Sequence, residues 1–199
     1  MIGHTGQRRP WLPVAGDDEP RHEVLEKPAR WLFELAKTRT DCEFELLDLR
    51  DYPLPFYDEA LPPAMIKGNY HNEVAKKWAN KIGEGDGYII VTPEYNHGYP
   101  GVLKNALDTV AVEWGKKPIG FMSYGSAMGT RSVQQLRQVS IELRMVPIEA
   151  ALQVPVDVFR AAISLKEDEA AKLFEPMKPF AVTFLDQMSW WAKSLKSLR

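Results

Sequence analysis

A polar turn near the middle of the chain carries residue types that suit ligand binding. In VTPEYNHGYPGVLKNALDTV, residues 91–110, an apolar run stops at Pro93 and a second proline, Pro100, opens a helix. The turn between them, residues 95–98, consists of residues that tolerate unusual backbone angles. Its outward-facing amides, one carboxamide and one imidazole suit the edge of a flat heteroaromatic ring that both donates and accepts hydrogen bonds.

A second candidate loop, SYGSAMGTRS at residues 123–132, also follows an apolar run. Its small residues, between 125 and 129, would let the backbone approach a planar ligand closely. A plainer interpretation is a strand-to-helix turn in which Thr130 or Ser132 caps the helix and Ser132 forms a capping box with Gln135. For this loop alone the plainer interpretation is favoured. Two such loops after neighbouring strands nevertheless favour a ligand site.

The helix after the first turn has an apolar face and a polar face. The polar face carries Lys104, Asn105 and Asp108. Lys104 and Asp108 are four residues apart in the less favourable order, so their mutual pairing should contribute at most roughly 0.3 kcal/mol. This weak pairing leaves partners outside the helix as an open alternative for these side chains.

The elements around these loops alternate between strands and helices, which is typical of a parallel sheet with helices on both faces. Apolar runs predict strands at residues 43–49, 87–92, 118–124 and 145–154. Helical spacing predicts helices at residues 27–38, 72–81, 101–112 and 130–143. Open sheets of this kind bind ligands at the carboxyl ends of their strands, where both candidate loops lie.

The first strand of such a sheet should lie within residues 1–26, and two placements are open. In one, RPWLPVAG at residues 9–16 is the strand and residues 16–24 form the turn, which puts Pro13 inside a central strand although it cannot donate to the ladder. In the other, residues 3–9 form the turn and almost nothing precedes them as a strand.

Two other segments are expected to lie outside the sheet. The loop at residues 50–65 contains four prolines and is predicted to be a rigid surface connection; a minority interpretation has Tyr52, Phe56 or Tyr57 border a ligand or a partner subunit. The carboxyl-terminal pattern is helical but interrupted by Pro176 and Pro179, and its tryptophan pair at residues 190–191 indicates that it packs against something. We predict a domain over residues 1–165 and a packed helical tail over residues 166–199.

Composition narrows the class of function. The 199 residues carry a net charge of -2 with scattered Lys and Arg, so no nucleic-acid or membrane partner is predicted. A single cysteine, Cys42, and the lack of a signal segment favour the cytoplasm. The four histidines show no metal-ligand spacing, and no G-x-G-x-x-G or Walker A pattern occurs. Ser126 and His97 keep acyl transfer formally open, although GSAMG is not the nucleophile elbow of hydrolases.

One family matches these motifs. TPEYNHGYPGVLKNALD at residues 92–108, followed by SYGSAMG at residues 123–129, resembles the NADPH-dependent FMN reductase family of flavodoxin-like proteins, which includes quinone, azo-dye and chromate reductases. The likeness covers roughly residues 27–154 and includes LLDLRDYPLPFYDE at residues 46–59. It implies a doubly wound, five-stranded parallel sheet between two helical layers, here with an atypical N-terminus and an extra C-terminal helical tail.

The resemblance also implies a site and a chemistry. The residues that it places around the isoalloxazine ring of FMN are Pro93, Glu94, Tyr95 and Asn96, with Ser123, Tyr124 and Gly125 along another side. Main-chain amides of residues 94–96 would bind the pyrimidine edge. Hydride would pass from NAD(P)H to the flavin, and the electrons would then pass to a quinone, azo dye, metal oxyanion or free flavin. No side-chain acid, base or nucleophile is needed, so no catalytic residue is predicted. Members assemble as dimers or tetramers, here through the helix with Lys104, Asn105 and Asp108.

The chain departs from the family in the turn after the first strand. Members carry a Gly-Ser-x-Arg-x-x-Ser-like turn that holds the FMN phosphate, whereas residues 16–24 read GDDEPRHEV. Its three carboxylates, at residues 17–19, oppose a dianion, since one like-charge contact at 4 Å costs about 4 kcal/mol at an effective dielectric constant of about 20. Arg21 is the phosphate partner that this turn offers; Arg8 and Arg9 are the alternative.

Two hypotheses of function follow. The favoured one is an FMN-dependent NAD(P)H oxidoreductase. The other is a flavodoxin-like protein with impaired or lost FMN binding that acts as an oligomeric binding or scaffold module. A hydrolase is a distant third.

Overall fold

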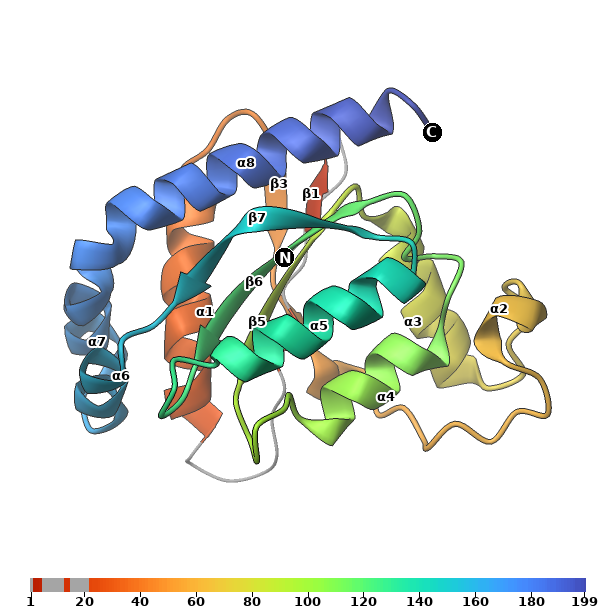
Figure 1. Cartoon of the computed structure of the whole chain (residues 1–199), viewed down its shortest axis with the longest axis horizontal. Helices are drawn as coiled ribbons and strands as arrows, with labels where there is room; N and C mark the ends of the chain where they lie inside the picture. Colours follow the sequence, from red (N-terminus) through yellow and green to blue (C-terminus); the bar gives the residue numbers. More distant parts are fainter. Residues whose placement is uncertain (1, 5–12, 15–21) are drawn as a thin grey trace.

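A five-stranded parallel sheet forms the centre of the molecule (Figure 1). The structure, a computed structural model, describes residues 2–4, 13–14 and 22–199. Across the sheet the strands follow the order β4 (Leu47–Asp48), β2 (Pro13–Val14), β5 (Tyr88–Pro93), β6 (Pro118–Tyr124) and β7 (Val146–Gln153). Numbered along the chain, these five strands have the order 2-1-3-4-5 of flavodoxin-like folds. The predicted fold class is confirmed.

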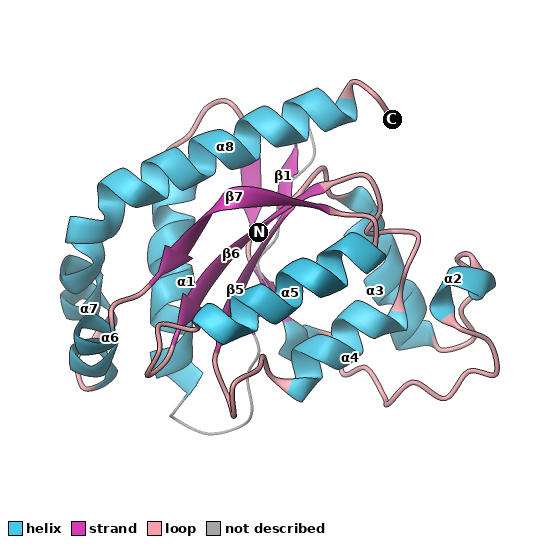
Figure 2. Cartoon of the chain, in the orientation of Figure 1, coloured by secondary structure: helices cyan, strands magenta, loops and turns pink. Residues whose placement is uncertain are grey.

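Helices cover both faces of this sheet (Figure 2). One face is covered by α3 (Glu73–Glu84), α4 (Gly101–Thr109) and α5 (Thr130–Glu142). The other is covered by α1 (His22–Lys37) and α8 (Lys178–Lys196), with α6 (Val156–Ile163) and α7 (Glu167–Phe174) beside α1. The remaining elements are β1 (Ile2–His4), β3 (Glu43–Glu45), the short helix α2 (Pro63–Ile66) and the 3-10 turns η1 (Leu49–Asp51) and η2 (Glu175–Met177).

Strand β5 explains why both faces need a cover. All six of its residues are buried. Tyr88 and Ile90 point into the core on the α3–α5 side, whereas Ile89 and Val91 point into the core beneath α1 and α8. Because successive strand side chains face opposite ways, a continuously apolar strand requires helices above and below it.

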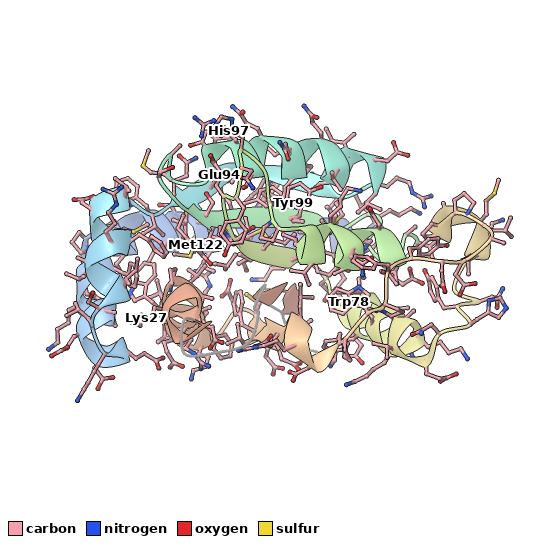
Figure 3. All side chains as sticks on the ribbon, turned by 90° about the horizontal axis from the view of Figure 1, so that it is seen from below. Lys27, Trp78, Glu94, His97, Tyr99 and Met122 are labelled. Atoms are coloured by element: carbon pink, nitrogen blue, oxygen red, sulfur yellow. The ribbon has the colours of Figure 1, made fainter. Side chains whose placement is uncertain are left out.

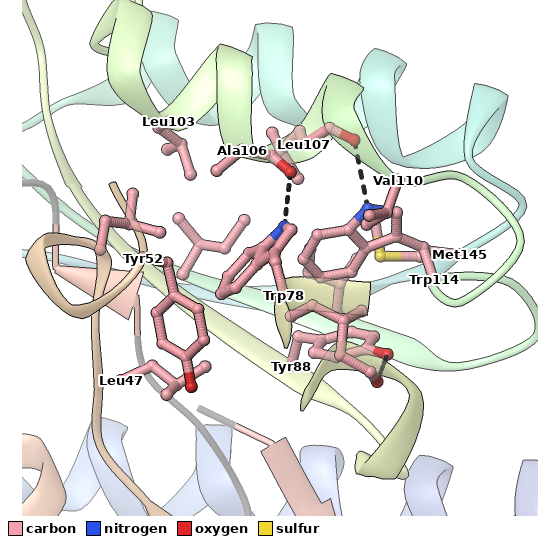
Figure 4. Close-up of a cluster of buried hydrophobic side chains, with 14 of the residues drawn as sticks. Leu47, Tyr52, Trp78, Tyr88, Leu103, Ala106, Leu107, Val110, Trp114 and Met145 are labelled. Atoms are coloured by element: carbon pink, nitrogen blue, oxygen red, sulfur yellow. Dashed lines mark hydrogen bonds between the residues drawn. The ribbon is translucent and has the colours of Figure 1, made fainter. Parts of the chain in front are cut away.

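Aromatic side chains dominate the core between the sheet and α3–α5 (Figure 4). The Trp114 ring lies 4.8 Å from the ring of Tyr88 and 5.9 Å from that of Trp78, centre to centre and edge to face. The indole N–H of Trp78 donates to the Ala106 carbonyl at 2.8 Å, and that of Trp114 donates to the Leu107 carbonyl at 3.2 Å. Both buried indoles are therefore satisfied by the carbonyls of α4, which fixes that helix on the sheet.

The predicted elements agree with the structure apart from their ends. The strand predicted at residues 118–124 is β6 itself, and the strand predicted at 87–92 is β5 shifted by one residue. The strand predicted at residues 43–49 was wrong as a single element: it divides into β3 and β4 around Leu46, and β3 pairs with β1 outside the central sheet. Helix α4 ends at Thr109, three residues before the predicted end, because Val110 adopts an extended conformation.

The structure favours the first of the two placements of the opening strand. Pro13 and Val14 form β2 between β4 and β5, with Val14 opposite Val91. The alternative turn at residues 3–9 disagrees with β1, whose residues pair with β3. The predicted turn at residues 16–24 is too long, since α1 begins at His22. Arg8, Arg9, the three carboxylates at 17–19 and Arg21 lie outside the described residues.

The carboxyl-terminal segment forms part of the helical layer. Pro176 lies in η2 and Pro179 in the first turn of α8, where a missing amide proton is tolerated. Helix α8 packs on β6 and β7 so closely that a Cβ added at Gly120 would lie 2.6 Å from the Phe184 ring. Trp191 is half-buried against this core, whereas Trp190 is 62% exposed, so only one of the tryptophans follows the expectation that the pair packs. The boundary between residues 165 and 166 stays a prediction.

Candidate functional site

The two predicted loops meet at the carboxyl end of the sheet. Pro93 lies opposite Tyr124 at the ends of β5 and β6. Directly after these strands, the Glu94 amide donates to the Tyr124 carbonyl at 3.0 Å. The expectation that the two loops follow neighbouring strands is therefore confirmed, and the loops form one surface.

Residues 95–98 form a tight hairpin turn. The Tyr95 amide donates to the Gly98 carbonyl at 2.8 Å, and the Gly98 amide returns a bond to the Tyr95 carbonyl at 3.0 Å. Asn96 and His97 have φ angles of 51° and 69°, the left-handed pair that a type I′ turn requires. Asn adopts this region more readily than most residues, which agrees with the unusual backbone angles predicted for this turn.

The amides that this turn offers to a ligand differ from those predicted. The amides of Glu94 and Tyr95 are engaged in the bonds described above, so two of the three predicted donors are unavailable. Within the described part of the chain, the amides of Asn96 and His97 have no hydrogen-bond acceptor. Both residues are exposed, and the Tyr95 side chain beside them is 49% exposed. The amides that remain open are therefore those of Asn96 and His97, at the tip of the turn.

The Glu94 carboxylate faces helix α5 (Figure 3). Its side chain is only 4% exposed. One oxygen accepts from the Arg131 guanidinium at 2.5 Å and the other from the Arg131 amide at 3.1 Å. Glu94 therefore stabilises the first turn of α5 with its negative charge, and its side chain is not directed toward a ligand.

Ser123 and Tyr124 of the second loop are covered by the protein. Ser123 is buried and its hydroxyl donates to the Met128 carbonyl at 2.8 Å. Tyr124 is buried against Phe159 at 4.6 Å between ring centres, and burial raises the pKa of its phenol far above the ordinary value. Their carbonyls accept from the amides of Val154 and Glu94, so contact of these two residues with a ligand stays a prediction.

The glycines of this loop serve the protein itself. Gly125 has a φ of 141°, and a Cβ there would lie 3.2 Å from the Glu94 Cβ. At Gly129, with a φ of 74°, a Cβ would lie 2.4 Å from the Ser123 Cβ. At both glycines an added Cβ would therefore meet the protein, and the prediction that the small residues of this loop let the backbone approach a ligand stays a prediction.

The predicted capping box is absent from α5. Gly129 occupies the N-cap position without a side-chain cap. The Ser132 hydroxyl donates to the Pro93 carbonyl at 3.0 Å, and the Gln135 carboxamide donates to the His97 carbonyl at 3.0 Å. The prediction failed because these polar side chains bind the neighbouring loop instead of their own helix.

The sequence analysis did not predict the roles of two residues near the site. Arg131 holds Glu94, as described above. Lys27 of α1 is buried, and its ammonium donates to the carbonyls of Ala162, Ile163 and Leu165 at 2.6–3.3 Å, which binds α1 to the end of α6. A lysine within an amphipathic helix gives no signal in sequence that it will be buried.

The polar side chains of α4 bind both within the helix and outside it. Lys104 and Asp108 form an ion pair with each other on the surface, and the subunit contact predicted through this helix stays a prediction. Long, exposed side chains at this spacing reach each other even in the less favourable order. The Asn105 carboxamide donates to the Leu54 and Pro55 carbonyls at 3.3 and 3.0 Å, and so holds the proline-rich loop.

The aromatic residues of that loop divide between core and surface. Tyr52 is buried beside Trp78, 5.0 Å between ring centres, which excludes it as a ligand or partner contact. Phe56 is 89% exposed. The Tyr57 hydroxyl donates to the Leu61 carbonyl, which stiffens the loop.

Other kinds of site find no support in the described part of the chain. No group of three or more His, Cys, Asp or Glu side chains is arranged there to hold a metal. None of the helices described has the length and apolar character needed to cross a membrane.

The described start of α1 carries its own charge network. Glu26 is nearly buried and pairs with Arg30 at 2.6 Å and with Arg50. Arg50 also pairs with Asp48 at the end of β4. Both cations are therefore engaged by carboxylates within the chain.

Three relatives show what the chain is similar to. An NAD(P)H-dependent FMN reductase of Schizosaccharomyces pombe is 41% identical over 131 residues, which are 65% of this chain and 66% of the relative. A second enzyme of that description, from a Nectria species, is 40% identical and matched over 59% of its length, so the match leaves at least a third of both relatives uncovered. A quinone reductase of Pseudomonas putida is 32% identical over 174 residues, 84% of this chain and 86% of that protein.

A solved structure agrees with the fold. The flavoenzyme NAD(P)H:(acceptor) oxidoreductase FerB of Paracoccus denitrificans superposes with a TM-score of 0.64 at 22% identity, covering 94% of this chain and 98% of FerB. The sequence model of the family described as NADPH-dependent FMN reductase matches residues 21–157, which include both loops of the site and more than half of the chain. The chain therefore belongs to the NADPH-dependent FMN reductase family.

Proposed function

We propose that this protein is an FMN-dependent NAD(P)H oxidoreductase. The observation that carries the proposal is the exposed turn after β5, whose Asn96 and His97 amides are open in a chain of this family. Bound FMN would supply the redox chemistry, in which a hydride from NAD(P)H, which leaves NAD(P)+, and one proton from solvent convert a quinone to its hydroquinone.

The role of the protein in this proposal is to hold and polarise the ring. Open N–H groups at the carboxyl end of a parallel sheet stabilise negative charge on the pyrimidine edge of a reduced flavin. The backbone of residues 93–96 would border one side of the ring, with Ser123, Tyr124 and Gly125 along another. The buried Glu94 carboxylate is engaged with Arg131, so Glu94 would act in this role through its backbone.

The phosphate of FMN is the second part of the proposal. Arg21, just before α1, would bind it together with the amino-terminal dipole of that helix. The three carboxylates at residues 17–19 oppose this. If these carboxylates prevent FMN from binding, the second candidate function applies, a flavin-poor binding or scaffold module.

A quinone is the acceptor that the relatives favour. The Pseudomonas putida relative is named a quinone reductase, and one from a Burkholderia species, 30% identical, is named a 2-hydroxy-1,4-benzoquinone reductase. Azo dyes, metal oxyanions and free flavin remain further candidates, because an open flavin face discriminates poorly among flat or small acceptors. The unpaired Cys42 is compatible with a cytoplasmic site of action.

The proposed assembly is a homodimer or homotetramer through the face of α4. A groove of about 810 Å³ beside this helix is lined by residues that include Tyr57, Asp108 and Ile141. Ile141, in the lining of this groove, is 67% exposed, which supports burial against a second copy.

Titration of the purified, flavin-free protein with FMN tests the proposal. The expected result is quenching of FMN fluorescence with a saturable isotherm, followed by bleaching of the bound flavin on addition of NADPH under nitrogen. Replacing Asn96 with Pro removes one of the two open amides and, because proline cannot adopt a φ of 51°, also reshapes the turn, so binding should weaken. Replacing the exposed Gln138 with Ala should leave binding unchanged. Failure to bind FMN at high micromolar concentration would favour the scaffold hypothesis.

A further inference from the structure

The open amides of Asn96 and His97 depend on a backbone shape that neither residue prefers. Both residues have positive φ angles, which are uncommon for residues other than glycine. Such a turn persists when its surroundings hold it in place. Its own two cross-turn bonds, between Tyr95 and Gly98, close the loop but do not fix its direction relative to the sheet.

Helix α5 supplies that direction through three contacts made within its first two turns. Arg131 binds the Glu94 carboxylate, and the Ser132 hydroxyl binds the Pro93 carbonyl. These two contacts fix the entry to the turn. The third contact, from Gln135 to the His97 carbonyl at 3.0 Å, is at the tip.

Gln135 and Gly98 fit each other closely. A Cβ added at Gly98 would lie 2.9 Å from the Gln135 Oε1 atom, closer than such atoms approach. The missing side chain at Gly98 therefore makes the room in which the Gln135 carboxamide reaches the turn. The His97 carbonyl and the Gly98 amide belong to one planar peptide unit, so the bond to this carbonyl orients the whole tip.

We propose that Gln135 is a positioning residue for flavin binding, which rests on the function proposed above. By holding the His97 carbonyl, it keeps the amides of Asn96 and His97 directed at the ligand. It acts through the turn and takes no part in the chemistry. Sequence analysis assigned the same residue to a capping box, a role that the structure excludes.

The test compares Gln135 with its neighbour Gln134. Gln135→Glu keeps the shape of the side chain but removes its N–H donor. Gln135→Ala removes both the shape and the donor. Gln134→Glu and Gln134→Ala are the matched controls, because Gln134 is exposed on the same helix and bonds to no described residue. We expect the dissociation constant for FMN to rise about three- to tenfold in both Gln135 variants, as for the loss of one hydrogen bond. The Gln134 variants should bind like the wild type.

Two further measurements separate positioning from a loss of stability. The visible absorption spectrum of bound FMN should shift in Gln135→Glu, since it reports hydrogen bonding at the ring, while the melting temperatures of all four variants should match. In the flavin-free protein, hydrogen exchange of the Tyr95 and Gly98 amides should be faster in the Gln135 variants than in the controls.

The outcomes are distinct. Unchanged affinity and unchanged exchange in the Gln135 variants would overturn the positioning role. Weaker binding with an unshifted spectrum and a lowered melting temperature would also overturn it, in favour of a structural role. A wild type that binds no FMN overturns the proposed function, and the exchange measurement then still decides whether Gln135 holds the turn.

Discussion

At the carboxyl end of the sheet, Gln135 holds the carbonyl of a turn that stays exposed, whereas at the amino end a buried lysine is bonded within the chain. Gln135 binds the loop after β5, and the Ser132 hydroxyl binds the carbonyl of Pro93, the last residue of that strand. At the opposite end, the Lys117 ammonium donates to the carbonyls of Ile82 and Gly83 at 3.0 and 3.3 Å and to the Tyr88 hydroxyl at 2.7 Å.

The difference lies in what each end leaves unsatisfied. The Tyr88 hydroxyl lies 2.8 Å from the Ile82 carbonyl and 3.1 Å from the Glu113 carbonyl and donates its single proton between them. Asp86 pairs with Lys196 of the last helix and with Arg199 at the terminus. These polar groups at the amino end are buried and bonded within the chain. At the carboxyl end, two amides remain open and exposed. We infer that the amino end serves stability, and that contacts of the same kind at the carboxyl end serve a site.

The largest expected effect is at the amino end. Trp114→Ala should lower the free energy of unfolding by about 3–5 kcal/mol, because the ring is 1% exposed and packs on Tyr88 and Trp78. Urea denaturation followed by circular dichroism measures this change. Trp190→Ala, which removes a ring that is 62% exposed, is the control and should cost less than about 1 kcal/mol. Equal losses in the two variants would contradict the assignment of stability to this core.

Lys117 should make stability depend on pH. Burial lowers the pKa of its ammonium from 10.5 to about 7. Between these values the unfolded chain binds a proton that the folded protein does not, so the free energy of unfolding rises with pH, and it is lowest below the folded pKa. The rise should amount to about 2–4 kcal/mol from about pH 7 to about pH 10, since one pKa unit corresponds to about 1.4 kcal/mol.

The comparison that isolates this effect is with Lys117→Met. The variant lacks the titrating group, so its stability should show no such rise, and the difference between the two proteins should grow across this range of pH. Parallel curves of stability against pH for both proteins would show that the folded Lys117 keeps its ordinary pKa.

At the carboxyl end, Glu94→Ala should have an intermediate effect. It removes both acceptors for Arg131 from a buried position, which should lower the free energy of unfolding by about 1–2 kcal/mol. Hydrogen exchange should be faster at the Tyr95 and Gly98 amides than in the wild type, while the amino end stays protected. Unchanged hydrogen exchange at these two amides would show that Glu94 does not hold the turn in its shape.

The smallest effect is expected on the surface of α4. Asp108→Asn removes the ion pair with Lys104, and because both side chains are nearly half exposed, the free energy of unfolding should change by about 0.3 kcal/mol. If this face forms a subunit contact, the free energy of subunit dissociation should change by more than the free energy of unfolding does. Sedimentation velocity measures the dissociation, with the distant Asp186→Asn as a control.

Features set by near neighbours in the sequence could be predicted, whereas features set by segments far apart in the sequence could not. The run YIIV predicted a central strand because its apolar residues require cover on both faces, and β5 confirms this. The loop after it was recognised as a special turn because Asn96 and Gly98 have local backbone preferences. The split of the strand predicted at residues 43–49 was not foreseeable, since the pairing of β3 with β1 joins segments about forty residues apart.

The hydrogen-bond partner of each polar group was also decided by residues far away in the sequence. Sequence spacing assigned Ser132 and Gln135 to their own helix, whereas their partners, Pro93 and His97, lie in a loop nearly forty residues earlier. The same holds for the amides of Glu94 and Tyr95, which spacing offered to a ligand and which the folded chain uses itself.

By itself, the sequence determined the order of strands and helices, the family and the position of the ligand loops, because hydrophobic periodicity and turn chemistry act between near neighbours. Only the tertiary structure decided which donors remain open, Asn96 and His97, and which side chain holds them there. A hydrogen bond is satisfied by whichever acceptor the fold brings within about 3 Å, and that partner is set by packing.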